Sequence, residues 1–152
     1  IDENFEKKPS NIYGKYKLKS ENYIRKHLKD FLILRIFNIY GPNQPKGYFF
    51  PDIKEKIKNK QKICINNSYR DFIHVNEVSR FLNFSIKKDL KGILNLGSGK
   101  SFSLQKIIKM ISNKLKKPCI IIKYNKTDKI VSSNNLIRKI GYKIKNEKNF
   151  NI

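Results

Sequence analysis

The sequence predicts an α/β fold, because short apolar runs that suit buried strands alternate with longer amphipathic stretches that suit helices. Its 152 residues allow one domain, or one domain with part of another, and are enough to bury a core. Hydrophobic residues make up 39% and charged residues 30%, which is the composition of a folded chain. No run of about 18 apolar residues occurs, so we expect no membrane-spanning helix and no membrane partner.

The first elements are a helix over residues 11–29 and a strand over 31–39. Apolar residues recur at helical spacing in the first segment, whereas the second, FLILRIFNI, is a nearly continuous apolar run that suits a parallel sheet. Glycines and prolines then crowd residues 41–47 and predict a loop. Pro51 opens a further helix that reaches about Lys60.

The remaining elements continue the alternation. Asn76 and Ser103 are residue types that cap helix N-termini, and Pro118 and Gly141 stand where helices should end. The elements expected in chain order are a strand at 62–65, a turn at 66–68, an extended segment at 71–75, a helix at 76–87, a strand at 93–96, a helix at 103–116, a strand at 119–123 and a helix at 134–140.

The net charge of +22 rests on 34 basic residues, of which only five are Arg. Specific recognition of phosphates and bases favours the planar fork of Arg, and the Lys residues here are scattered through every segment. We therefore expect a solvated Lys-rich surface, non-specific binding of polyanions at low salt and no specific nucleic-acid partner.

The cysteines and histidines predict no metal site. Cys64 and Cys119 lie in apolar runs without a histidine at metal-ligand spacing, and His27 and His74 are isolated. We expect buried thiols in strands, a structural role for His74 and a reducing, cytoplasmic environment.

The segment ILNLGSGKSF, residues 93–102, looks like a phosphate-binding loop. A P-loop requires a glycine where Leu94 stands, and the dinucleotide fingerprint that Gly97 and Gly99 could begin requires a third glycine where Phe102 stands. We therefore expect a tight strand-to-helix turn rather than a nucleotide site.

Tyr13 and Lys17 are the sharpest chemical feature of the sequence. At positions i and i+4 of the expected helix they share one face, where a cation beside a phenol lowers the phenol pKa. Such a tyrosine can serve as acid or base toward an alcohol or ketone. The pattern alone is a weak signal in a Lys-rich chain with eight Tyr.

The blocks around this pair are similar to those of a known family. The sequence resembles the extended short-chain dehydrogenase/reductases, that is, the NAD-dependent epimerase/dehydratase family acting on nucleotide sugars. The resembling blocks, in family order, are NIYGKYKLKSE (11–21), LRIFNIYGP (34–42), FFPDI (49–53), RDFIHVNEVSRF (70–81), ILNLGSGKSFSL (93–104) and LIRKIGYK (136–143). The resemblance implies the C-terminal part of a Rossmann-like parallel sheet plus a small α/β substrate-binding domain.

The resemblance also implies a division of the chain. Residues 1–45 would supply the catalytic helix and a late Rossmann strand, and 46–152 mainly the substrate-binding domain, with 70–117 returning partly to the Rossmann sheet. The family's glycine-rich fingerprint and its catalytic Ser or Thr have no match here, so we expect a chain that begins inside a longer protein and binds NAD or NADP poorly alone. An isolated half sheet would be poorly soluble or oligomeric, whereas the full-length protein would be a homodimer.

Site residues follow from the resembling blocks. Tyr13 would be the catalytic acid/base and Lys17 would hold the nicotinamide ribose, with the Tyr40, Gly41 and Pro42 loop passing near the nicotinamide.

The substrate, a nucleotide-diphosphate sugar, would meet Asn38 near the sugar or diphosphate and Arg70 at the diphosphate. A capped strand end is an equal alternative for Asn38, and a structural salt bridge is the alternative for Arg70. The family's late Arg-x-Gly-Asp is at best residues 125–128 here, where Lys126 would be a weaker phosphate contact.

The reaction implied is that of an NAD(P)-dependent nucleotide-sugar 4-epimerase or 4-ketoreductase, typically in surface-polysaccharide synthesis. The loop after Pro42 lacks the histidine that the family's 3,5-epimerase/reductases carry. The sugar, the nucleotide and the choice between NAD and NADP stay open. The alternative is a catalytically inactive basic remnant or polyanion-binding module.

Overall fold

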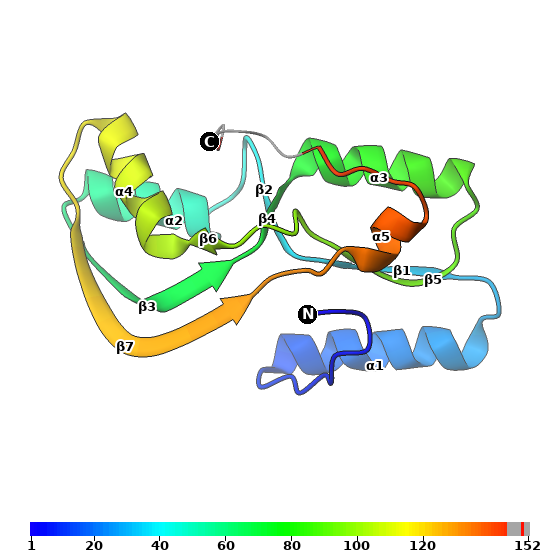
Figure 1. Cartoon of the computed structure of the whole chain (residues 1–152). Coiled ribbons are helices and arrows are strands. Elements are labelled where there is room, and N and C mark those ends of the chain that lie inside the picture. The colour runs from blue at the N-terminus through cyan, green and yellow to red at the C-terminus, as the bar shows by residue number, and fades with distance from the viewer. Residues whose placement is uncertain (146–149, 151–152) are drawn as a thin grey trace.

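Two groups of strands and helices make up the chain, and a computed structural model describes residues 1–145 and 150 (Figure 1). The elements are α1 (Ile12–His27), β1 (Leu32–Ile36), β2 (Asn38–Tyr40), α2 (Phe49–Lys58), β3 (Lys62–Arg70), β4 (Phe72–His74), α3 (Val75–Lys87), β5 (Gly92–Leu96), β6 (Phe102–Ser103), α4 (Leu104–Leu115), β7 (Ile120–Ile130) and α5 (Asn135–Lys139). The predicted α/β class is confirmed, with parallel pairing in all three sheets.

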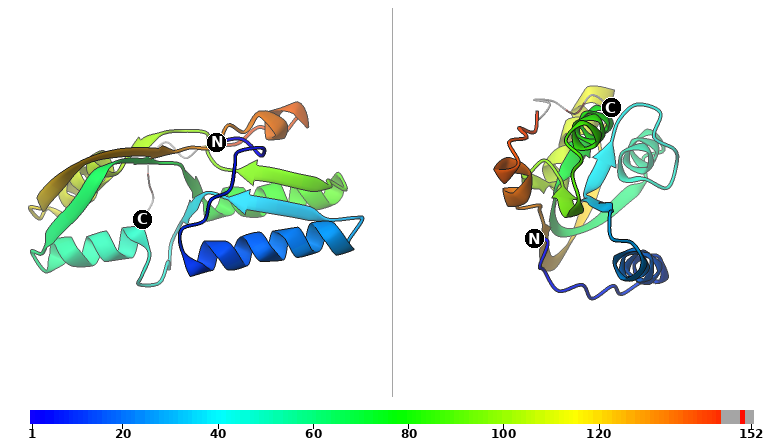
Figure 2. Two further views of the ribbon diagram at one scale, coloured as in Figure 1. Left: turned by 90° about the horizontal axis from the view of Figure 1, so that it is seen from below. Right: turned by 90° about the vertical axis from the view of Figure 1, so that its right-hand side faces the viewer.

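The Rossmann-like group is built on β1 and β5, which pair in parallel from Leu32 opposite Gly92 to Ile36 opposite Leu96. Helix α3 lies on one face of this pair and α1 on the other (Figures 1 and 2). Phe81 and Ile137 are fully buried with Leu96, so α3 and α5 are held to the sheet by a common apolar core.

The smaller group is a sheet in the order β6-β3-β7, with α2 and α4 packed on one face (Figure 1). Its core joins Ile57 of α2, Ile63 of β3 and Ile108 of α4, all almost completely buried. The short parallel pair β2–β4 lies between the two groups and connects them.

The turn predicted at residues 66–68 is wrong, because β3 runs unbroken through it. Its partner β7 is also longer than the strand predicted at 119–123, and pairs with β3 along the whole of that strand. The register passes from Asn66 opposite Tyr124 to Asn67 opposite Thr127, so the irregularity falls on β7 as a bulge.

The strand predicted at 31–39 is two strands with different partners. The Phe37 amide donates to the Leu96 carbonyl, at 2.9 Å, while the Asn38 amide donates to the Asp71 carbonyl, at 3.2 Å. The chain therefore leaves the β1–β5 pair and joins β4 within one residue. This change of partner places Asn38 at the junction of the two groups.

Three local predictions also need correction. His74, not Asn76, is the N-cap of α3, since its Nδ1 accepts a hydrogen bond from the Asn76 amide at 3.2 Å. Cys64 is exposed rather than buried, because it lies on the face of β3 opposite Ile63. Cys119 is half-buried and precedes β7.

The glycine turn after β5 encloses the carboxylate of Asp71, which is fully buried. The Ser98 and Gly99 amides donate to it at 2.7 and 2.9 Å, and the Ser132 amide donates at 3.1 Å. A Cβ at Gly97 would lie 2.4 Å from Asp71 Oδ2, so only glycine fits there. The turn that resembles a phosphate loop thus binds an anion of its own chain.

Asp71→Asn should destabilise the fold by about 3 kcal/mol or more, because an amide NH₂ would face backbone donors that then lose their acceptor. Urea denaturation of the 152-residue chain measures this. Asp30→Asn is the matched control, since among the described residues Asp30 pairs with Lys91 alone, at the surface, and its loss should barely move the midpoint. Equal midpoints for the two variants would contradict the role given to Asp71.

Candidate functional site

The first turn of α1 presents Tyr13 and Lys17 together, as the spacing predicts. Asn11 caps the helix by accepting a hydrogen bond from the Gly14 amide at 2.7 Å. Gly14 allows Pro9 to pack closely, because a Cβ there would lie 2.9 Å from Pro9 Cβ. The Tyr13 side chain is 70% exposed, and Lys17 Nζ lies 5.5 Å from the centre of its ring.

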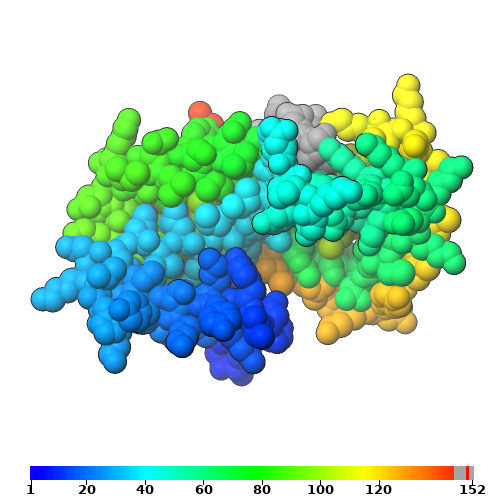
Figure 3. All heavy atoms as spheres, turned by 180° about the vertical axis from the view of Figure 1, so that it is seen from behind, coloured from blue at the N-terminus to red at the C-terminus, as the bar shows by residue number. Residues whose placement is uncertain are grey.

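Asn38 and Tyr13 line one hollow of about 320 Å³, although they come from different elements. Figure 3 shows this face of the molecule hollowed where the N-terminal residues, in blue, face the smaller sheet. The Asn38 side chain donates through Nδ2 to the Asp71 carbonyl, at 2.8 Å, which fixes the direction of its amide. The other lining residues are Ile36, Phe37, Ile39, Gln44, Tyr48, Phe49, Phe50 and Phe72.

Gln44 is a polar residue of this hollow that the sequence analysis did not identify. Its Nε2 donates to the Ile39 carbonyl at 3.0 Å, and its buried Oε1 has no hydrogen-bond partner within the described residues. Because the donor end is held, Oε1 is the end left to accept a hydrogen bond. The sequence signal that could have identified Gln44 as a site residue is its position in the loop after a strand.

The loop at Tyr40, Gly41 and Pro42 can offer a ligand its backbone groups but not the side chain of Tyr40. The Tyr40 ring is buried against Phe50 and lies edge-on to His74. A Cβ on Gly41 would be 2.6 Å from the Val75 side chain, so the loop packs tightly against the start of α3.

Arg70 forms a salt bridge with Asp128, which is the structural alternative expected for it, and Lys126 acts on the same carboxylate only through its charge. Arg70 donates to Asp128 Oδ2 at 2.5 Å and to the Tyr69 carbonyl at 2.9 Å. The Ser68 hydroxyl, which also donates to Asp128, lowers the carboxyl pKa most, followed by Arg70 and the charge of Lys126. Ser68, Arg70 and Asp128 thus form a charged cluster across β3 and β7, in which Ser68 lies opposite Asp128.

The N-terminal segment is fastened across the β1–β5 pair ahead of α1. Arg35 donates to both oxygens of Glu21 on α1, at 3.0 and 2.7 Å, and to the Glu3 carbonyl at 2.7 Å. Glu3 accepts a hydrogen bond from the Asn95 amide at 2.8 Å, and Lys7 pairs with Glu21 at 2.5 Å. The segment and the helix that carries Tyr13 are therefore held by one ionic network.

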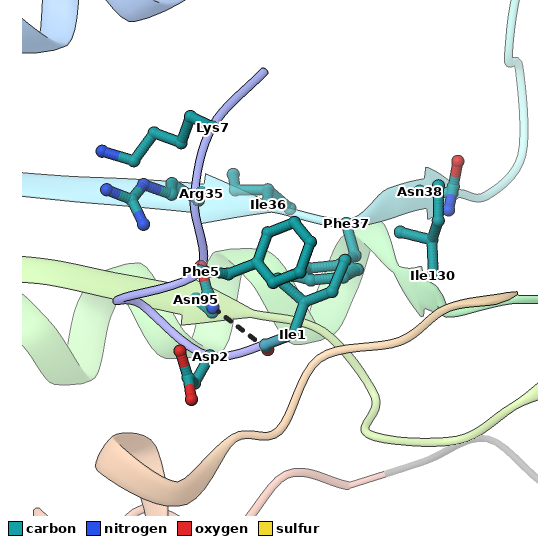
Figure 4. A pocket seen from close by; sticks show the side chains of 10 residues that line it. All are labelled: Ile1, Asp2, Phe5, Lys7, Arg35, Ile36, Phe37, Asn38, Asn95 and Ile130. Carbon is teal, nitrogen blue, oxygen red and sulfur yellow. Dashed lines mark hydrogen bonds between the residues drawn. The ribbon is translucent and has the colours of Figure 1, made fainter. Parts of the chain in front are cut away.

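A second hollow, of about 380 Å³, lies beside this segment. Figure 4 shows Ile1, Phe5 and Phe37 close together, with a hydrogen bond from Asn95 to the Ile1 carbonyl at 3.3 Å. Its walls include residues 36–38, which it shares with the Tyr13 hollow. The two hollows therefore have this stretch of chain in common.

Two other kinds of site were sought in the described ranges. No group of three His, Cys, Asp or Glu side chains there could hold a metal ion. Among residues 1–145 and 150, no helix has both the length and the apolar character needed to cross a bilayer.

The family comparison agrees with the motifs. The model of the NAD dependent epimerase/dehydratase family matches residues 1–97, which is more than half of the sequence. The chain therefore belongs to this family.

A curated relative and two solved structures extend the comparison. The dTDP-4-dehydro-6-deoxyglucose reductase of Escherichia coli is 33% identical over 124 residues, covering 74% of this chain and 39% of the relative. The UDP-N-acetylglucosamine 4-epimerase of Methanobrevibacter ruminantium M1, solved with UDP-N-acetylmuramic acid, superposes with a TM-score of 0.79 at 24% identity and covers 95% of this chain and 52% of that one. WbmG of Bordetella bronchiseptica, solved with NAD, gives 0.80 at 18% identity, with 97% and 49% covered.

These likenesses confirm the Rossmann-like α/β fold. The chain spans about two fifths of the curated relative and about half of each solved structure.

The stability that the Glu21 network contributes should decrease at acid pH. Hydrogen bonding from Arg35, aided by Lys7, lowers the Glu21 pKa from 4.5 to about 2. A carboxyl whose pKa is lower in the folded than in the unfolded state stabilises the fold at pH values above its unfolded pKa. This contribution is lost as pH falls from about 4.5 toward 2. Urea midpoints measured across this range should fall more steeply for the wild-type chain than for Glu21→Gln.

Glu6→Gln is the control, because Glu6 forms only an exposed pair with Lys8. Its pH profile should follow that of the wild-type chain. Parallel profiles for the wild-type chain and Glu21→Gln would refute the network.

Proposed function

We propose that this chain is the substrate-side portion of an NAD(P)-dependent nucleotide-sugar 4-epimerase or 4-ketoreductase. Tyr13 exchanges a proton with a hydroxyl or carbonyl of the sugar as its acid/base. Lys17, whose Nζ lies 5.5 Å from the centre of the Tyr13 ring, holds the nicotinamide ribose. Asn38 binds the substrate, while Arg70 and Lys126 bind its diphosphate.

The observation that carries the proposal is the hollow shared by Tyr13 and Asn38. An acid/base must lie within hydrogen-bond reach of the group whose proton it moves, and Tyr13 is exposed at the wall of a space that can hold a sugar. The remaining wall is largely aromatic and aliphatic. A few polar groups in an apolar hollow orient a ligand.

The charged cluster at Asp128 supports a diphosphate site. Arg70 is held by the Tyr69 carbonyl and by Asp128, so its planar group is already ordered before a ligand arrives. Lys126 adds a second positive charge at the same carboxylate. A diphosphate would bind there by pairing with the two cations.

The residues of this chain fit one end of the cofactor. When bound, the nicotinamide accepts or gives a hydride at the sugar carbon. Lys17 and the backbone at Gly41 and Pro42 would hold its nicotinamide riboside end. The glycine turn after β5 does not fit the pyrophosphate, because Asp71 already fills it.

The activities named for two similar proteins favour a reaction at C4. The Escherichia coli relative is a dTDP-4-dehydro-6-deoxyglucose reductase and the archaeal structure is a UDP-N-acetylglucosamine 4-epimerase. We place the activity in the cytoplasm, in the supply of sugars for surface polysaccharides.

A homodimer through α1 is part of the proposal. Helix α1 exposes Ile12, Tyr16 and Tyr23, and its C-cap residue Leu28 is also exposed, so that a second copy could cover an apolar surface here. The domain boundaries at residues 45 and 46 stay a prediction.

Tyr13→Phe should abolish turnover, because it removes the proton-carrying hydroxyl while keeping the ring. The assay uses the protein as encoded by its complete open reading frame, with UDP- and dTDP-sugars and both cofactors. We expect a fall of at least about 10²-fold in kcat. Tyr23→Phe, on the same helix, is the control and should stay active.

An active Tyr13→Phe enzyme would contradict the assignment of Tyr13 as the acid/base. Loss of activity in both variants would indicate damage to α1 instead. If the encoded protein shows no turnover and binds polyanions with a steep salt dependence, the basic-module alternative replaces the enzyme.

A further inference from the structure

The glycine turn after β5 also lines a hollow separate from the catalytic site. Ser98, whose amide and hydroxyl bind Asp71, forms part of a space of about 320 Å³ between the turn, α5 and the segment that follows it. In Figure 1 this segment runs from α5 toward α3. The other lining residues are Asn134, Arg138, Tyr142, Lys143 and Ile144.

Two positive charges face this hollow without an opposing charge. Arg138 lies on α5 and Lys143 follows it, and both are exposed. Within the described residues neither forms an ion pair with a carboxylate, and no acidic residue is among those that line the hollow. Glu77, which accepts the Tyr142 hydroxyl at 2.9 Å, is already paired with Arg80.

The polar floor of the hollow is fixed. The Asn134 side chain is only 2% exposed, donates to the Gly97 carbonyl at 2.8 Å and accepts the Ser132 hydroxyl. The Arg138 amide donates to the Asn134 carbonyl at 3.1 Å, so α5 is anchored to the same floor. Arg138 is therefore carried by a helix that is anchored to this floor, and Lys143 follows in the segment whose Tyr142 hydroxyl is bonded to Glu77.

We propose that this hollow binds a phosphate monoester. The guanidinium of Arg138 can pair with two phosphate oxygens and Lys143 can supply a point charge. The volume is at the small end for ligand sites, so it suits a sugar phosphate better than a dinucleotide. Tyr142 and Ile144 give the attached group an apolar wall. The site does not depend on the proposed reaction.

The test is calorimetric titration of the encoded protein with glucose 1-phosphate and with inorganic phosphate, at constant ionic strength. The double variant Arg138→Ala/Lys143→Ala should weaken binding of glucose 1-phosphate by about 10-fold or more. The control is Lys87→Ala/Lys88→Ala, which removes the same charge from the exposed end of α3 and should change affinity little.

Three results would overturn the proposal. The first is an equal loss in the two double variants, which would reduce the binding to general surface charge. The second is the absence of binding to the wild-type protein. The third is equal affinity for glucose 1-phosphate and inorganic phosphate, since the apolar wall at Tyr142 should favour the ester.

Discussion

The buried carboxylate of Asp71 is the contact on which the rest of the arrangement depends. Through its side chain it holds the turn at Ser98 and Gly99, and through its carbonyl it holds Asn38. Its amide donates to Ile130 at the end of β7, at 3.0 Å. One residue thus links both groups of strands, and an anion buried without these donors would be too costly to keep in the fold.

The buried Asp71 carboxylate also distinguishes the proposed site from the glycine turn that resembles a phosphate loop. A glycine turn between a strand and a helix offers amide donors that could bind a phosphate, but here they are already bonded to Asp71. The proposed site lies instead where α1, β2 and the loop carrying Gln44 meet, since these bring Tyr13 and Asn38 to one hollow. The ionic network at Glu21 fixes α1 against β1 and so fixes Tyr13.

Local sequence signals predicted the features that depend on residues close together in the chain, namely a helix cap and a shared helix face. Ser103 caps a helix as predicted, and the spacing of Tyr13 and Lys17 put them on one face. The sequence could not predict contacts set by distant strands: β3 is continuous because β7 pairs with it from more than fifty residues away. The partner of Arg70, Asp128, and the orphan oxygen of Gln44 depend on the same long-range geometry.

Amide hydrogen exchange of the encoded protein, with and without UDP-glucose or dTDP-glucose, tests most directly where a nucleotide sugar binds. The account predicts slower exchange in peptides covering 38–48 and 66–70, which hold Asn38, Gln44 and Arg70. It predicts no change at 97–99, because the amides of Ser98 and Gly99 are already bonded to Asp71. Protection confined to 97–99, or none at 38–48, would contradict it.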